Sequence, residues 1–170
     1  MQYLGQVANA SVEAKYPLRW YTPIGLPIKQ QYMKSEALKV KTKIDGVIRL
    51  RSISQETDEI NPRKQRNAFS PNLVHSLDAA LMMKVVNILA KGTSFAMVHD
   101  SFGTHAADAE AMSVAIRQAY YETFKGNVLE DIVEDIKCNL PEGYKEIVPM
   151  LPLMGNLKIE DILEARYMFS

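Results

Sequence analysis

The 170-residue sequence lacks the features that mark several common protein classes. Its single cysteine, Cys138, excludes an internal disulfide framework and a cysteine-based zinc site. Its three histidines do not follow the HExxH zinc spacing, and the phosphate-binding patterns GxGxxG and GxxxxGK[ST] are absent. There is no apolar run of about 18 residues or more, and Met1–Pro17 lacks a secretion signal pattern. We therefore expect a globular chain in an intracellular, reducing compartment, with no membrane partner.

The net charge is zero, but the charges are unevenly distributed along the chain. Residues 15–66 contain 12 lysines and arginines and 5 acidic residues, whereas residues 105–170 contain 6 and 12. A basic first third joined to an acidic last third predicts that a polyanion binds one side of the protein. A chance fluctuation in surface charge is the alternative.

Residues 36–53 alternate apolar and basic side chains around Asp45-Gly46. Asp-Gly between two alternating runs is a strong hairpin signal, because both central residues of such a turn need positive φ. We therefore predict a β-hairpin with strands over residues 37–44 and 47–53. It would carry five basic side chains: Lys39, Lys41, Lys43, Arg49 and Arg51.

We expect this basic hairpin to project from the protein as a ribbon, because it has little apolar face to bury. A two-stranded ribbon fits the major groove of DNA. An exposed edge hairpin whose lysines only prevent aggregation is the alternative.

The remaining segments predict helices and a second, shorter hairpin, which makes the fold class α+β. Residues 17–32 are rich in proline and are expected to be extended or looped. Ser70-Pro71 is a favourable helix start, and apolar residues spaced three to four apart predict a helix to about Ala90. Further helices are predicted over residues 106–124, 128–140 and 158–166.

The second hairpin, over residues 94–104, contains the most distinctive local feature, His99-Asp100-Ser101, at its predicted turn. An aspartate at the tip of a buried hairpin costs desolvation energy unless a positive charge pairs with it, and Mg²⁺ would supply that charge. Two such ions can stabilise the attacking and leaving oxygens of phosphoryl transfer. A turn aspartate that bonds its own backbone is the alternative, and the spacing alone favours it.

His75 and Asp78 are three residues apart on the predicted helix and therefore share a face. The spacing alone favours an exposed polar stripe on this helix. No catalytic triad follows from it.

Four blocks of the sequence, in order, resemble the C-terminal part of single-subunit, phage-type DNA-directed RNA polymerases, a family that includes the mitochondrial enzymes. The blocks are TPIGLPIKQQY with the basic hairpin, NAFSPNLVHSLDAALM, FAMVHDSFGTHAAD and GNLKIEDILEARYMFS. Together they cover nearly the whole chain. The resemblance implies part of a right-hand polymerase palm, in which helices lie over a small antiparallel hairpin.

The resemblance also implies a division of the chain into two parts. Residues 1–70 match the end of the fingers, and the hairpin at 36–53 matches a specificity loop. Residues 71–170 match the C-terminal part of the palm, which includes the motif C hairpin at 94–104 and a C-terminal foot at 155–170.

Individual residues acquire expected roles from this resemblance. Asp100 matches the motif C aspartate that binds the catalytic Mg²⁺ ions, which overturns the preference for a plain turn residue. His99 matches a residue that supports the active-site hairpin, and His75 matches a histidine that reaches the minor-groove side of the nascent base pair. In the specificity loop that phage enzymes insert into the promoter major groove, Lys39 and Lys41 fall near base-reading positions. The ending Phe169-Ser170 matches one that packs close to the active site.

Several parts of the family are absent from this chain. These are the second metal-binding aspartate of motif A, the NTP-binding lysine and sugar-sensing tyrosine of the fingers, the thumb and the promoter-melting domain. With one protein ligand for a two-metal Mg²⁺ site, the chain is expected to be inactive alone. The implied partners are template and promoter DNA, RNA, NTPs and the remainder of the polymerase.

Two other functions stay open on the sequence. A family A DNA polymerase has a related His-Asp hairpin, but its next residue is usually Glu, whereas Ser101 follows here. A degenerate palm that only binds nucleic acid or a partner is the non-enzyme alternative. The expected location is the cytoplasm of a phage-infected or prophage-carrying bacterium, with a mitochondrial location less favoured.

Overall fold

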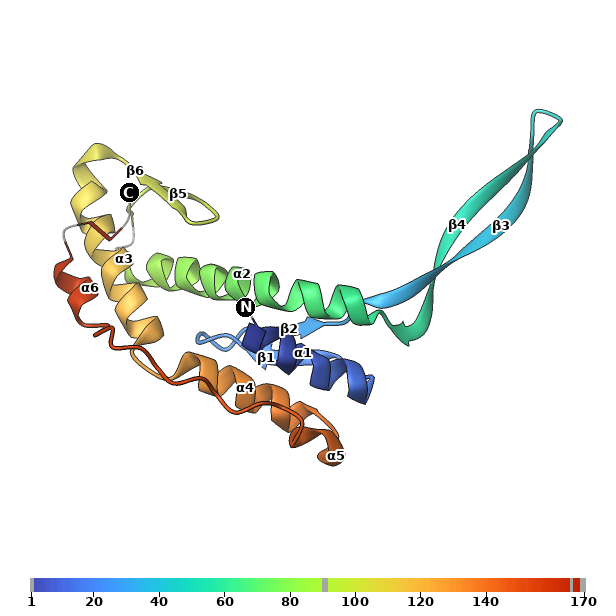
Figure 1. Ribbon diagram of the computed structural model, residues 1–170. Helices are drawn as coiled ribbons and strands as arrows, with labels where there is room; N and C mark the ends of the chain where they lie inside the picture. Colours follow the sequence, from blue (N-terminus) through green and yellow to red (C-terminus); the bar gives the residue numbers. More distant parts are fainter. Residues whose placement is uncertain (1, 90–91, 166, 169–170) are drawn as a thin grey trace.

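The computed structural model describes residues 2–89, 92–165 and 167–168, and it confirms the α+β class (Figure 1). The helices are α1 (Gln2–Ala14), α2 (Pro62–Ile88), the short 3₁₀-helix η1 (Ala106–Asp108), α3 (Ala109–Phe124), α4 (Val128–Asn139), α5 (Glu142–Lys145) and α6 (Asp161–Glu164). The strands are β1 (Leu18–Tyr21), β2 (Pro27–Gln30), β3 (Met33–Ile44), β4 (Val47–Ile60), β5 (Phe95–Val98) and β6 (Ser101–Thr104). They pair as three antiparallel hairpins, β1–β2, β3–β4 and β5–β6, within the described residues.

The main core lies where α1, α2 and α4 meet the β1–β2 hairpin (Figure 1). The rings of Trp20 and Phe69 meet edge to face, with centroids 5.6 Å apart, and both are almost fully buried. The Trp20 indole N–H donates to Ser76 Oγ at 3.1 Å, so the one polar group of the ring is satisfied inside the core. Helix α1, which the sequence did not predict, covers this core with the buried side chains Val7 and Ala10.

Helix α2 begins nine residues before the predicted start, at Pro62 instead of Pro71. The Asn61 side chain accepts a hydrogen bond from the Lys64 amide at 3.1 Å, and Pro62 occupies a first-turn position that suits proline. Pro71 therefore lies inside the helix, where it cannot donate a backbone hydrogen bond. Phe69 and Leu73, buried on either side of it, hold the helix against the core and offset that loss. The helix thus crosses residue 70, and the assignment of the two parts to fingers and palm stays a prediction.

The hairpin predicted around Asp45-Gly46 is present, with φ of 50° and 78° at these two residues. Its strands are longer than predicted, because the pairing extends back to Met33 and Ile60 across a register shift. An ion pair strengthens this root, where Lys34 Nζ lies 2.6 Å from a carboxylate oxygen of Glu59. The hydrogen bond from Lys34 lowers the pKa of the Glu59 carboxyl below its usual value. The hairpin extends away from the rest of the protein as a twisted ribbon (Figure 1).

The remaining predictions have mixed outcomes. The β5–β6 hairpin and helix α4 lie where they were predicted. Helix α3 starts at Ala109, because the preceding residues form η1, and α6 is confined to Asp161–Glu164. The predicted C-terminal contact of Phe169-Ser170 lies outside the described residues. Within the part of the chain that the structure describes, no helix is long and apolar enough to cross a membrane.

The segment after α5 leaves several large apolar side chains in solvent. Met150 and Leu153 are 92% and 100% exposed, and Leu157 is 78% exposed. A contiguous exposed apolar surface of this kind often marks a contact with another protein or another part of a larger one.

The Trp20–Phe69 contact predicts a large and specific loss of stability when the Phe69 ring is removed. Phe69→Ala should lower the free energy of unfolding by about 3–5 kcal/mol, because a fully buried ring leaves a cavity. Urea denaturation, followed by the fluorescence of Trp20, measures this change. Val74→Ala on the same helix is the control, since Val74 is 50% exposed and should cost less than about 1 kcal/mol. Equal losses for the two variants would contradict the role assigned to Phe69.

Candidate functional site

Asp100 lies in the two-residue turn between β5 and β6, where Val98 pairs with Ser101. His99, the other turn residue, has φ of 55°, a conformation that histidine adopts more readily than most side chains. The expectation that this turn is buried is wrong for the described chain: Asp100 is exposed and Val98 is 68% exposed. The cost of desolvation therefore gives no argument for a metal ion at Asp100 in this chain alone.

The described residues do not by themselves form a metal site. No three histidine, cysteine, aspartate or glutamate side chains among them lie close enough together to hold a metal ion. Mg²⁺ binds oxygen ligands and commonly keeps several waters, with one or two carboxylates and substrate phosphates as its other ligands. The exposed Asp100 carboxylate fits one position in such a set, and further carboxylates would have to come from other parts of a larger protein.

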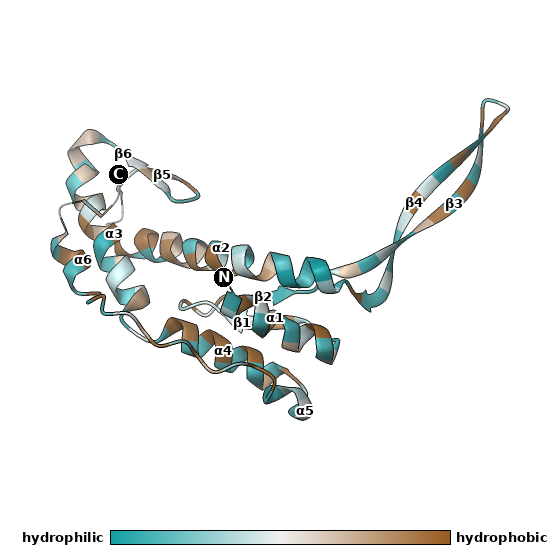
Figure 2. Ribbon diagram, in the orientation of Figure 1, coloured by the Kyte–Doolittle hydropathy of each residue, from teal (hydrophilic) through white to brown (hydrophobic). Residues whose placement is uncertain are grey.

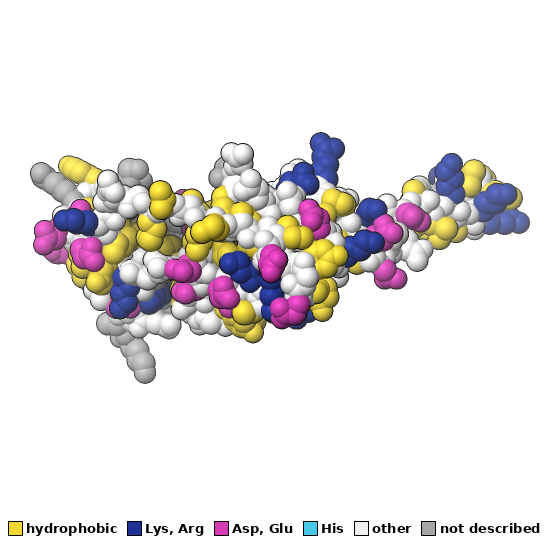
Figure 3. Space-filling view, turned by 60° about the horizontal axis from the view of Figure 1, so that its bottom comes forward, with side chains coloured by type: hydrophobic (Ala, Val, Ile, Leu, Met, Phe, Trp, Pro, Cys, Tyr) yellow, Lys and Arg dark blue, Asp and Glu magenta, His cyan; other side chains and the backbone are white. Residues whose placement is uncertain are grey.

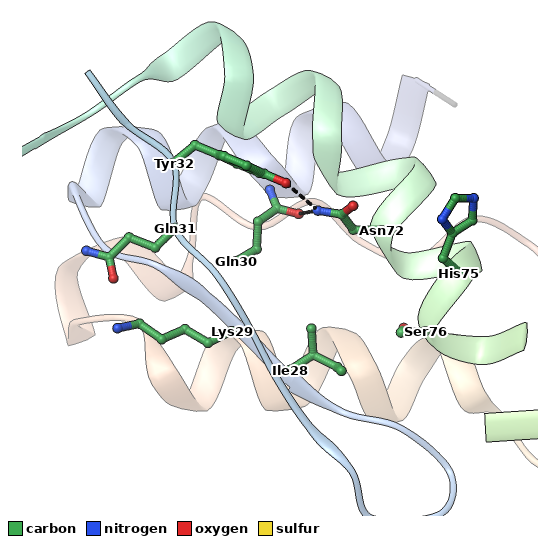
Figure 4. A pocket seen from close by; sticks show the side chains of 8 residues that line it. All are labelled: Ile28, Lys29, Gln30, Gln31, Tyr32, Asn72, His75 and Ser76. Atoms are coloured by element: carbon green, nitrogen blue, oxygen red, sulfur yellow. Dashed lines mark hydrogen bonds between the residues drawn. The ribbon is translucent and has the colours of Figure 1, made fainter. Parts of the chain in front are cut away.

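His75 lines a separate hollow of about 400 Å³ between α2 and β2, which includes neither His99 nor Asp100 (Figure 4). Asn72, one turn before His75, donates through Nδ2 to Gln30 Oε1 at 3.0 Å and to the Tyr32 hydroxyl at 3.2 Å. His75 is exposed at the edge of this hollow. His75, which the sequence analysis predicted as a site residue, therefore lines this hollow. The other lining residues include a hydrogen-bonded set that the sequence did not reveal: Gln30, Tyr32 and Asn72.

Gln65, which is fully buried, fastens the end of β2 to α2. Its Nε2 donates to the Gln30 carbonyl at 3.0 Å, and its Oε1 accepts from the Tyr32 amide at 3.1 Å. In return, Gln30 Nε2 donates to the Gln65 carbonyl at 2.7 Å. A sequence signal for this residue exists: Gln65 is four residues before Phe69 and therefore lies on the core face of the helix.

The five basic residues of the β3–β4 hairpin do not form one surface. Lys39, Lys41 and Lys43 pair with Ser52, Leu50 and Ile48, whereas Arg51 and Arg49 pair with Val40 and Thr42. Cross-strand partners share a face, and successive residues of a strand point to opposite faces. The three lysines therefore lie on one face, called here the lysine face, and the two arginines lie on the other.

The arginine-bearing face is also apolar, which contradicts the expectation that this hairpin has little apolar surface. It carries Leu38, Ile44, Val47 and Ile53, which are about half exposed. Figure 2 shows hydrophobic and hydrophilic residues alternating along both strands. The lysine face also carries Ile48 and Leu50, the cross-strand partners of Lys43 and Lys41, so apolar side chains are exposed on both faces of the hairpin. Figure 3 shows Lys and Arg side chains gathered towards the far end of the hairpin.

Comparison with known proteins gives a consistent result. A sequence model of the family described as DNA-dependent RNA polymerase matches residues 2–148. DNA-directed RNA polymerase 1, mitochondrial, of Nicotiana sylvestris is 35% identical over the whole chain, which covers 16% of that protein. DNA-directed RNA polymerase 3B, chloroplastic, of Nicotiana tabacum is 37% identical, with 17% of its length covered. DNA-directed RNA polymerase 2A of Nicotiana tabacum is 34% identical, and the chain spans 49% of its length.

These relatives correct the expected location. The cytoplasm of a phage-infected or prophage-carrying bacterium is contradicted, because the relatives bear the names of mitochondrial and chloroplastic enzymes of plants. The sequence blocks behind that expectation resemble a family that includes both phage and mitochondrial members. These blocks contain no signal that separates the two sources.

The hydrogen bonds of Asn72 predict that its side chain stabilises the hollow. Asn72→Ala leaves the buried Oε1 of Gln30 without its donor, so the free energy of unfolding should fall by about 1–2 kcal/mol relative to the control. Asn67→Ala is that control, since it makes the same change at an exposed position of α2 and has the same effect on helix propensity. Urea denaturation of both variants measures the difference, and an equal effect would contradict the assigned role of Asn72.

Proposed function

This chain belongs to the family of DNA-dependent RNA polymerases, and we propose that it forms the C-terminal catalytic portion of such an enzyme. The observation that carries the proposal is the match of the whole chain to DNA-directed RNA polymerases, with His99 and Asp100 in an exposed two-residue turn. The chain spans about a sixth of the length of the first two relatives described above. The proposed activity is therefore that of a larger protein of which this chain is a part.

The proposed reaction is nucleotidyl transfer, in which the 3′-hydroxyl of RNA attacks the α-phosphate of an NTP and pyrophosphate leaves. Two Mg²⁺ ions, when bound, would stabilise the attacking and leaving oxygens. Asp100 would hold them, because its carboxylate stands at the tip of a hairpin where phosphate oxygens can approach it. His99 would set the conformation of that turn, and the hollow beside His75 would face the minor groove of the new base pair.

The chain by itself is expected to be inactive. A two-metal centre needs several carboxylates, and the described residues contain no cluster of three His, Cys, Asp or Glu side chains that could hold a metal ion. The segments expected to bind the NTP are also outside this sequence. Template and promoter DNA, RNA, NTPs and the rest of the polymerase are the proposed partners.

The β3–β4 hairpin is proposed to contact DNA through its lysine face. Lys39, Lys41 and Lys43 are exposed or solvent-facing along one side of a ribbon narrow enough for a major groove. The names of the relatives favour an RNA polymerase over the family A DNA polymerase alternative. A degenerate, non-catalytic module remains the alternative that the first experiment below tests.

Asp100→Asn in the complete polymerase should lower templated NTP incorporation by about a thousandfold or more, because it removes a charged metal ligand. Primer extension with a saturating NTP supply measures the rate. Asp108→Asn is the matched control, since Asp108 lies nearby in sequence in η1 and its side chain makes no capping hydrogen bond to α3. Full activity of the Asp100 variant would support the non-catalytic module.

Removing the three lysines of the lysine face should weaken binding of promoter DNA and flatten its dependence on salt. Each phosphate contact contributes about 0.9 to the slope of log affinity against log salt concentration, so Lys39→Ala/Lys41→Ala/Lys43→Ala should lower the slope by about 2–3. Arg49→Ala/Arg51→Ala on the opposite face should change it less. A larger change for the arginine pair would show that the wrong face was assigned to DNA.

A further inference from the structure

Arg117, in the middle of helix α3, joins two parts of the chain that are 48 residues apart. Its Nε and Nη2 groups both donate to the carbonyl oxygen of Ala165, at 3.2 and 3.0 Å. Its Nη1 group donates to the carbonyl and the hydroxyl of Ser113, one turn earlier on the same helix. The planar guanidinium group is therefore bound by acceptors on two sides, which fixes the direction of a long side chain.

The acceptor on Ala165 is a carbonyl at the end of helix α6. The last carbonyls of a helix have no partner within that helix and need a donor from elsewhere. Arg117 supplies the donor, so the end of α6 is attached to one point of α3, beside which it lies in Figure 1. Helix α6 has four residues, and none of them is buried. Its place on α3 therefore depends strongly on these hydrogen bonds.

Helix α3 also carries the hairpin on which Asp100 lies. Phe102, on strand β6, packs against a buried cluster that includes Met112 and Ile116 of α3. Ile116 directly precedes Arg117 in the helix. The β5–β6 hairpin and the end of α6 are thus attached to neighbouring positions of one helix, and α3 sets the distance between them.

The chain that follows Ala165 can reach the β5–β6 hairpin from this attachment. Met112 and Arg117 are five residues apart, which is about 8 Å along the helix axis. An extended chain advances at most about 3.3–3.6 Å per residue, so three residues cover a similar distance. Holding Ala165 at Arg117 therefore keeps the following residues within reach of the hairpin.

We propose that Arg117 is a positioning residue for the proposed polymerase reaction. It holds the end of α6, and with it the residues after Ala165, in register with the hairpin that carries Asp100. This inference rests on the proposed function and adds to it a residue that touches neither the metal ions nor the substrates. Small displacements matter in such a site, because a shift of about 1 Å at the reacting groups can lower a rate about a hundredfold.

The first test is the rate of templated NTP incorporation by the complete polymerase. Arg117→Ala should lower kcat by about 10–100-fold, whereas the KM for NTP should change by less than about threefold, because no group that binds the NTP is altered. Gln118→Ala is the control in the same helix. Gln118 is exposed and donates to Glu122 of α3, so its loss should change neither value. An unchanged kcat for Arg117→Ala would overturn the inference.

A deletion then distinguishes positioning from a purely structural role. In the complete polymerase, deletion of residues 167–170 should lower kcat. Arg117→Ala should lower kcat by less than about twofold further in the shortened protein, since both changes act through the same residues. If Arg117→Ala costs the same factor in both proteins, or if the deletion leaves kcat unchanged, Arg117 does not act through the chain after Ala165 and the inference fails.

Two conservative variants identify the hydrogen bonds as the cause, and they carry the test if Arg117→Ala does not fold. Arg117→Lys keeps the charge and one donor group, so its kcat should lie between those of the wild type and the alanine variant. Arg117→Met keeps the length of the side chain but donates nothing, so its kcat should match that of the alanine variant. A methionine variant with wild-type kcat would overturn the inference.

Asp100→Asn separates this inference from the proposed function. If that variant abolishes incorporation while Arg117→Ala leaves kcat unchanged, the polymerase function stands and the positioning role fails. If the Asp100 variant keeps full activity, the catalytic assignment fails, and the positioning role that rests on it fails with it.

Discussion

The contact between helix α2 and the β1–β2 hairpin is the interaction on which the other features of this chain depend. Trp20 and Phe69 bury two large rings against each other, and α1 and α4 complete the core around them. The β3–β4 hairpin begins and ends at this contact, because Tyr32 and Asn61 are joined by a backbone hydrogen bond of 2.8 Å. The hollow beside His75 also lies along it. A shift of α2 along the strands would therefore displace the root of the β3–β4 hairpin and this hollow together.

Apolar packing alone would not set the position of α2 with this precision, because the hydrophobic effect is not directional. The hydrogen bonds of Gln65 supply the direction. They join one buried side chain to the backbone of Gln30 and Tyr32, and a slip of the helix would leave these groups without partners in the core. The hydrogen bond to Gln65 Oε1 also holds Tyr32 in place in the lining of the hollow beside His75. A buried polar residue that looks like an exception in a hydrophobic core thus connects the folding of the chain to its proposed binding surface.

The sequence predicted the features whose signals are local and missed those that depend on packing. Asp45-Gly46 and the β5–β6 turn were predicted correctly, because the turn residues and the alternation lie within a few positions. The predicted start of α2 was wrong, because Ser70-Pro71 and Asn61-Pro62 are both good local helix starts. The burial of Phe69, which lies between them, favours the earlier start. Gln30, Tyr32 and Asn72, which line the hollow beside His75, were not predicted, since their hydrogen bonds join positions about 40 residues apart. The location was wrong, and the roles of Asp100, His99 and His75 stay predictions.

The exposure of Asp100 has a physical consequence for how the proposed active site would work. A carboxylate in water attracts a divalent ion weakly, because the high dielectric constant reduces the interaction and the ion keeps its hydration shell. Covering the turn would exclude water, and a second carboxylate beside Asp100 would raise the negative charge, so both changes would strengthen metal binding at the same position. The solvent-exposed Met150 and Leu153 show that part of the apolar surface of this chain also lacks cover. The metal affinity of the proposed site would therefore be a property of the assembled polymerase. This chain would determine only the position of one metal-binding carboxylate, that of Asp100.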